Sequence, residues 1–176
     1  MFIVTYTGPF GYIKPWTAVR DAETYSQAFL TPSIIEGMRQ KLEVSEILRH
    51  RLRHRGIDSQ LERTQSAGWS VGRKQASRSL SILTRGVMLQ PELTLGFLNW
   101  EDAAKAAEQH LCLCRNEDVL LPRHAITEIS ESEFDHLPGV ELRFGESPES
   151  FLVGFNRFAD AAPMYGYLQI VDEEQA

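Results

Sequence analysis

Four arginines at alternating positions, with two histidines between them, are the residues of this sequence best suited to chemistry on a polyanion. The arginines are Arg49, Arg51, Arg53 and Arg55, and the histidines are His50 and His54. Guanidinium groups bind phosphate oxygens through paired hydrogen bonds, and a neutral imidazole can act as a general base in RNA cleavage. The alternative is that both histidines are exposed or contact only the backbone. A period of two predicts a strand with one strongly basic face, because helical spacing would scatter the four arginines around the axis.

Aromatic and basic side chains also alternate after the first Gly-Pro pair of the chain. Tyr12, Lys14, Trp16 and Arg20 follow Gly8-Pro9. Single-stranded RNA is held by this combination, with cations on the phosphates and flat rings against the bases. Tyr25 and Phe29 follow in the same segment, and the alternative is that Trp16, Tyr25 and Phe29 are core residues.

The distribution of charge favours a polyanionic partner, although the 176-residue chain has a net charge of −6. Residues 39–85 contain eleven basic and four acidic residues, so this stretch carries +7 and the remainder carries −13. Such an asymmetry indicates a basic surface on an otherwise acidic body. The alternative is a solvated face on which the charges are paired.

Motifs for other chemistry are missing from the sequence. It contains no P-loop, dinucleotide-binding glycine motif, nucleophile elbow or His-Glu-x-x-His segment. A metal site could recruit His110, Cys112, Cys114 and His124, but a Cys-x-Cys pair with scattered histidines lacks the usual zinc spacing. We therefore expect two buried structural cysteines and no metal or other cofactor.

The elements that must position these residues are mostly strands. A first strand is predicted to end at Gly8-Pro9, and helices are predicted to begin after Thr31 and after Asn99, which are suitable N-caps. Residues 56–72 are predicted to form a long loop. Further strands are predicted at residues 79–84, 87–95, 124–129, 140–144, 151–155 and 164–171. This order predicts an α+β fold, specifically a ferredoxin-like core with added β-hairpins.

The length suits one domain over residues 1–171, followed by an acidic frayed tail at residues 172–176. No apolar run approaches the ~20 residues that a membrane span needs, and the N-terminus lacks the basic start of a signal peptide. The two cysteines do not suggest a disulfide framework. We therefore expect a cytoplasmic protein with no membrane partner.

Four short motifs occur in a fixed order along most of the chain. They are Val4-Thr-Tyr-Thr-Gly-Pro-Phe10, Thr31-Pro-Ser-Ile-Ile-Glu-Gly37, the stretch 73–87 that begins Arg-Lys-Gln, and the closing stretch 155–171 that ends Gly-Tyr-Leu-Gln-Ile-Val. In this order they resemble the Cas-five subunits of CRISPR effector complexes, and particularly the type I-C-like branch. These subunits are RAMP proteins with an RRM-like fold.

The resemblance implies a subunit of a Cascade-like surveillance complex in antiviral defence. Such a subunit grips the 5′ handle of the CRISPR RNA (crRNA) and caps a filament of Cas-seven-type backbone subunits. It would also contact a large Cas-eight-type subunit and, indirectly, target DNA. The RNA-binding positions that carry over are Tyr12, Lys14, Trp16, Arg49, Arg51, Arg53, Arg55, Arg73, Lys74 and Arg78.

The sequence departs from this branch at the residues that cut precursor RNA in the relatives. The resemblance implies a tyrosine late in the first helix and a Lys-His pair entering the second, where this chain has Glu43 and Asn99-Trp100. A carboxylate would repel the scissile phosphate, and no cation replaces the pair in the transition state. We therefore expect a subunit that binds RNA without cutting it. Two alternatives stay open: a metal-independent endoribonuclease using His50 or His54, and an acidic protein-interaction or inhibitor module.

Overall fold

The computed structural model describes residues 1–15, 23–72, 76–156 and 159–172, with the backbone alone at residues 64–71 and 76–81. This part of the chain has an α+β fold with three helices and mostly antiparallel strands. The α+β prediction is therefore confirmed. No helix among the described residues is long and apolar enough to cross a membrane.

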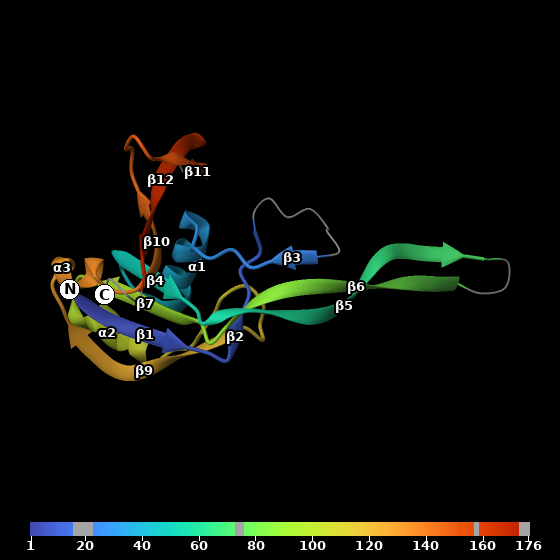
Figure 1. Cartoon of the computed structure of the whole chain (residues 1–176), viewed down its shortest axis with the longest axis horizontal. Coiled ribbons are helices and arrows are strands. Elements are labelled where there is room, and N and C mark those ends of the chain that lie inside the picture. Colours follow the sequence, from blue (N-terminus) through green and yellow to red (C-terminus); the bar gives the residue numbers. More distant parts are fainter. Residues whose placement is uncertain (16–22, 73–75, 157–158, 173–176) are drawn as a thin grey trace.

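The larger of the two sheets has eight strands in the order β11-β12-β10-β4-β7-β1-β9-β8 (Figure 1). Its strands are β1 (Phe2–Thr7), β4 (Arg49–Arg53), β7 (Glu92–Phe97), β8 (Leu111–Cys112), β9 (Val119–Glu128), β10 (Gly139–Phe144), β11 (Phe151–Asn156) and β12 (Ala162–Val171). The strands predicted after residue 124 are thereby confirmed. The prediction of two buried cysteines is wrong, because Cys112 lies on the short edge strand β8 and is half-buried, while Cys114 is exposed.

The strands β4, β7, β1 and β9 are neighbours in that order, and each pair is antiparallel. The helix α1 (Pro32–Leu42) precedes β4, and α2 (Trp100–Ala107) lies between β7 and β9. The register pairs Phe2 with Phe97 at one end of this group and Thr7 with Glu92 at the other. Arg53 also pairs with Glu92, so the ends of β4 and β1 flank the start of β7 on its two sides.

Both predicted helix starts are confirmed. Thr31 is the N-cap of α1 with proline next in the chain, and the Asn99 side chain accepts a hydrogen bond from the backbone N–H of Asp102 at 2.8 Å. The helices pack on one face of the sheet, where the buried Tyr6 hydroxyl donates to the Ala106 carbonyl at 2.6 Å. The hydrophobic core lies between this face and the two helices.

The opposite face of the sheet is covered at one end by the short helix α3 (Glu131–Asp135). Its N-terminus is fixed by a capping box, in which Ser130 and Glu133 each accept a hydrogen bond from the backbone N–H of the other. The ring of Phe134 is fully buried, with the Arg49 guanidinium 4.6 Å from its centroid. Because α3 covers only one end, the rest of this face remains open, and we call it the helix-free face.

The second sheet is dominated by a long ribbon that extends from the body of the molecule (Figure 1). It consists of β5 (Gly56–Val71) and β6 (Ala76–Leu89), with β2 (Phe10–Gly11) and β3 (Glu23–Tyr25) paired to β6. The prediction of a loop at 56–72 is wrong, because pairing with β6 satisfies the backbone of this polar segment. The two strands predicted at 79–84 and 87–95 are also corrected, since β6 continues to Leu89 and Pro91 separates it from β7.

Candidate nucleic-acid interface

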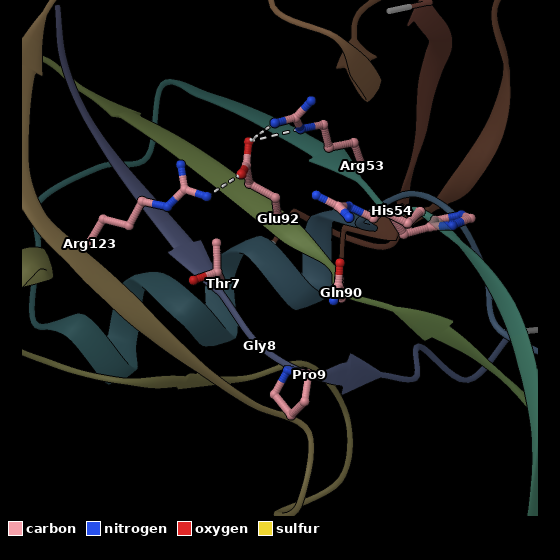
Figure 2. Close-up of a pocket in the computed structure, with 9 residues that line it drawn as sticks. Thr7, Gly8, Pro9, Arg53, His54, Gln90, Glu92 and Arg123 are labelled. Atoms are coloured by element: carbon pink, nitrogen blue, oxygen red, sulfur yellow. Dashed lines mark hydrogen bonds and ion pairs between the residues drawn. The ribbon is translucent and has the colours of Figure 1, made fainter.

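A pocket of about 410 Å³ lies at the end of the sheet where β1 ends and β7 begins (Figure 2). Segments that are far apart in the sequence contribute to it. Its lining residues are Thr7, Gly8, Pro9, Arg53, His54, Arg55, Gln90, Glu92 and Arg123. The Gly-Pro break, the β6–β7 turn and one end of the arginine ladder, as we call the alternating arginines of residues 49–55, therefore meet at one place.

Backbone hydrogen bonds between three chain segments form the frame of the pocket. The N–H of Gly8 donates to the Pro91 carbonyl at 3.3 Å, and the N–H of Gln90 donates to the Pro9 carbonyl at 2.9 Å. The N–H of Arg55 donates to the Leu89 carbonyl at 3.0 Å. A Cβ atom at position 8 would lie 2.5 Å from the Val119 carbonyl oxygen, so the close approach of β9 requires glycine here.

Two arginines in the pocket share one carboxylate. Arg53 donates to Oε1 of Glu92 from Nε at 2.8 Å and from Nη2 at 2.7 Å, and Nη2 of Arg123 donates to Oε2 at 2.7 Å. Figure 2 shows the Glu92 carboxylate between the two guanidinium groups. The arrangement orients both arginines, because Glu92 is a fixed partner for each of them.

Arg55 adds a third guanidinium group to this pocket. Its side chain is exposed and forms no hydrogen bond or ion pair with any described residue. His54 and Thr7 supply an imidazole and a hydroxyl, and Nδ1 of His54 is buried without a hydrogen-bond partner in the described part of the chain. The pocket thus offers cationic groups for a phosphate together with neutral hydrogen-bonding groups.

The other half of the predicted arginine ladder is buried. Arg49 is 6% exposed and donates to the two oxygens of Glu141 at 2.8 Å each and to Oδ1 of Asp135 at 2.7 Å. Arg51 is 2% exposed, and its Nη2 lies 3.4 Å from Oε2 of Glu141. The prediction of a strand is confirmed, but the prediction of a continuous basic face is wrong. The strand β10 and the helix α3 cover Arg49 and Arg51, so neither is accessible to a phosphate in this conformation.

His50 is also buried, on the opposite side of β4 from these arginines. Its Nε2 atom accepts a hydrogen bond from the backbone N–H of Leu142 at 3.4 Å. Burial lowers the pKa of His50 to about 4, although the nearby carboxylate of Glu141 opposes this change. His50 does not line the pocket and cannot reach an RNA hydroxyl outside the core.

The aromatic–basic segment after Gly8-Pro9 is only partly described. Tyr12 is buried, and the guanidinium carbons of Arg85 and Arg115 lie 5.7 Å and 5.4 Å from its ring centroid. Two cations therefore occupy the surroundings of the ring that a base would need. Tyr25, which the core alternative named, is exposed. Lys14 is exposed.

The side chains of four other predicted RNA-binding residues cannot be placed. Trp16, Arg73 and Lys74 lie outside the described residues. Arg78 lies on β6, where its backbone pairs opposite Trp69. These positions stay predictions.

Glu43 and Asn99-Trp100, where the resemblance would place RNA-cutting residues, lie away from the pocket. The Lys105 ammonium donates to the Glu43 carbonyl at 3.1 Å, and the Asp102 carboxylate accepts from the backbone N–H of Ser45 at 3.1 Å. Asn99 caps α2 beside them. The ring of Trp100 lies against Phe2, with the centroids 5.8 Å apart, at the Phe2–Phe97 end of the sheet, whereas the pocket lies near the Thr7–Glu92 pair. The pocket is therefore separate from these positions.

Four side chains that line the pocket were not predicted as site residues from the sequence: Thr7, Gln90, Glu92 and Arg123. Only the Gln90-Pro91 step gave a local signal, since proline commonly follows a turn. Among the described residues, no three histidine, cysteine, aspartate or glutamate side chains are grouped so as to hold a metal ion. Comparison of the sequence with protein-family models and with curated proteins found no match.

Proposed function

We propose that this protein is a non-catalytic RNA-binding subunit of a CRISPR surveillance complex, and that it holds the 5′ handle of crRNA at the pocket. In this proposal it caps a filament of Cas-seven-type subunits and contacts a Cas-eight-type large subunit. The observation that carries the proposal is the convergence of Arg53, Arg55 and Arg123 on one pocket, with Glu92 as the shared partner of two of them. Clustered guanidinium groups are the usual protein ligands of RNA phosphates.

The arrangement of strands supports a ferredoxin-like, RRM-like core for this proposal. The neighbours β4, β7, β1 and β9 are all antiparallel, and α1 and α2 occur between strands of this group in the order that such a core requires. The β5–β6 and β11–β12 hairpins would then be the additions to it. RRM domains bind single-stranded RNA on their sheet. Thr7, Arg53 and Glu92 are directly paired across strands and share the helix-free face.

The test is the affinity for RNA that carries a 5′ handle derived from a CRISPR repeat, measured by fluorescence anisotropy over a series of salt concentrations. We expect Arg55→Glu to weaken binding at least about tenfold and to reduce the salt slope by roughly 0.7, because one phosphate contact is lost. Lys41→Glu is the matched control, because Lys41 is an exposed cation on α1 that does not line this pocket. If the wild type binds no RNA, alone or with the other subunits, the proposal is rejected.

A second candidate, a metal-independent endoribonuclease, is favoured by one observation: the imidazole of His54 lies among the arginines of the pocket. His50 is excluded from this role by its burial. Repeat RNA incubated in EDTA distinguishes the two candidates. A discrete product that disappears in His54→Ala and persists in His124→Ala, where the histidine is exposed and outside the pocket, would replace the non-catalytic proposal.

A further inference from the structure

Gln90 occupies a backbone conformation that suits glycine. Its φ is 47°, in the left-handed region, where a side chain is disfavoured. It also precedes Pro91, and residues before proline favour extended backbone. The β6–β7 turn therefore carries a side chain at a position where glycine would relieve strain. Strained residues of this kind occur at ligand-binding sites, where the surrounding structure holds them in place.

The Gln90 side chain does not stabilise its own turn. The backbone bonds between Gly8 and Pro91, Gln90 and Pro9, and Arg55 and Leu89 fix the turn without it. The amide is exposed, lines the pocket and forms no hydrogen bond with any described residue. Figure 2 shows Gln90 at the same opening as Thr7 and His54. A rigid frame thus presents an uncommitted amide donor and acceptor to whatever occupies the pocket.

We propose that Gln90 recognises the adenine base of one unpaired nucleotide, whose phosphate is bound by the arginines of the pocket. This inference rests on the proposed RNA-binding function and names the nucleotide that the same site selects. A primary amide can donate to N7 of adenine and accept from its N6 amino group at the same time. Guanine presents two acceptors on this edge, and pyrimidines have no N7.

The size and charge of the pocket agree with a single nucleotide. A volume of about 410 Å³ lies at the lower end of the range for small-molecule sites and does not admit an RNA duplex. Arg123 is held in place by Glu92, and the exposed Arg55 has no side-chain partner among the described residues, so the pocket presents one oriented and one uncommitted guanidinium group to a phosphate. Recognition of a base by an amide beside such a cationic frame is typical of single-stranded RNA, whose bases can be splayed out.

The experiment uses the full chain and uridine hexanucleotides that carry one adenine, 7-deazaadenine, cytosine or guanine. We expect the adenine hexamer to bind about tenfold more tightly than the all-uridine hexamer, and the 7-deaza hexamer to lose this preference because it lacks N7. Gln90→Gly should bind every hexamer as weakly as the wild type binds all-uridine RNA. Its Tm should equal or exceed that of the wild type, because the backbone strain is relieved.

Asp160→Gly is the matched control. Asp160 also has a left-handed backbone, with a φ of 46°, but lies in the β11–β12 turn outside the pocket, so this variant should keep the adenine preference. The inference is overturned if the wild type binds all hexamers equally or prefers guanine. It is also overturned if Gln90→Gly keeps the preference for adenine. Absence of binding to every RNA instead rejects the proposed function, and this inference with it.

Discussion

Two carboxylates on the large sheet each hold a pair of arginines, but in different surroundings. Glu141 holds Arg49 and Arg51 beneath α3 and is 2% exposed. Glu92 holds Arg53 and Arg123 at the rim of the pocket, where these arginine side chains are 37% and 59% exposed. The difference shows that arginines on the same face of one strand are buried where α3 covers that face and partly exposed where it does not.

Removing the buried carboxylate should have the largest effect on stability. Glu141→Gln leaves two buried guanidinium groups without their shared counter-charge, and we expect a loss of about 3–5 kcal/mol in the free energy of unfolding. Urea denaturation measures this loss. Glu146→Gln, at an exposed carboxylate with no partner among the described residues, should change stability by less than about 0.5 kcal/mol. A cost below about 1 kcal/mol for Glu141→Gln would remove the distinction between the two clusters.

The buried half of β4 should also make stability depend on pH. The pKa of His50 is about 4 in the folded protein and about 6.5 when unfolded, so the unfolded state binds the proton first as the pH falls. Its contribution is therefore complete above pH 6.5 and lost progressively toward pH 4. Between pH 7 and pH 4.5 the wild type should lose about 2–3 kcal/mol more than His50→Gln does.

The control for this pH dependence is His124→Gln, since His124 is exposed on β9. This variant should follow the wild-type pH dependence. Equal curves for the wild type and His50→Gln would show that His50 titrates alike in the folded and unfolded states.

The smallest expected effect on stability comes from the matching change at the pocket. Glu92→Gln removes a shared carboxylate as Glu141→Gln does, but water can solvate the released arginines, so the cost should be no more than about 1 kcal/mol. The same variant raises the positive charge of the pocket, and its affinity for RNA should not fall by more than a few-fold. Urea denaturation and anisotropy measure the two quantities. A stability loss equal to that of Glu141→Gln would contradict the comparison.

Local signals predicted much of the fold correctly. The Gly8-Pro9 break ends β1, Thr31 and Asn99 cap the helices, and the alternation of arginines marks β4 as a strand. Each of these features depends on neighbouring residues, and this is why the sequence alone predicts them. The long ribbon was missed because its polar residues resemble a loop until the pairing of β5 with β6 is known.

The candidate site was less predictable because contacts across the sequence decide it. Alternation places Arg49 and Arg53 on one face, but it does not indicate that Glu141 and Phe134, more than eighty residues later, cover only the first of them. Glu92 and Arg123 join the pocket only through the pairing of β7 and β9 with β1, which the sequence does not show.

The length of the β5–β6 ribbon can change without altering the pocket. Beyond the β3 partners at Thr84 to Gly86, its two strands have only each other as strand partners in the described part of the chain. Because side chains alternate with a period of two, shortening both strands by two residues would leave every remaining side chain on its original face. The ribbon would then reach about 7 Å less far per step. The length of the ribbon can therefore vary in steps of two residues per strand while the large sheet and the pocket stay unchanged.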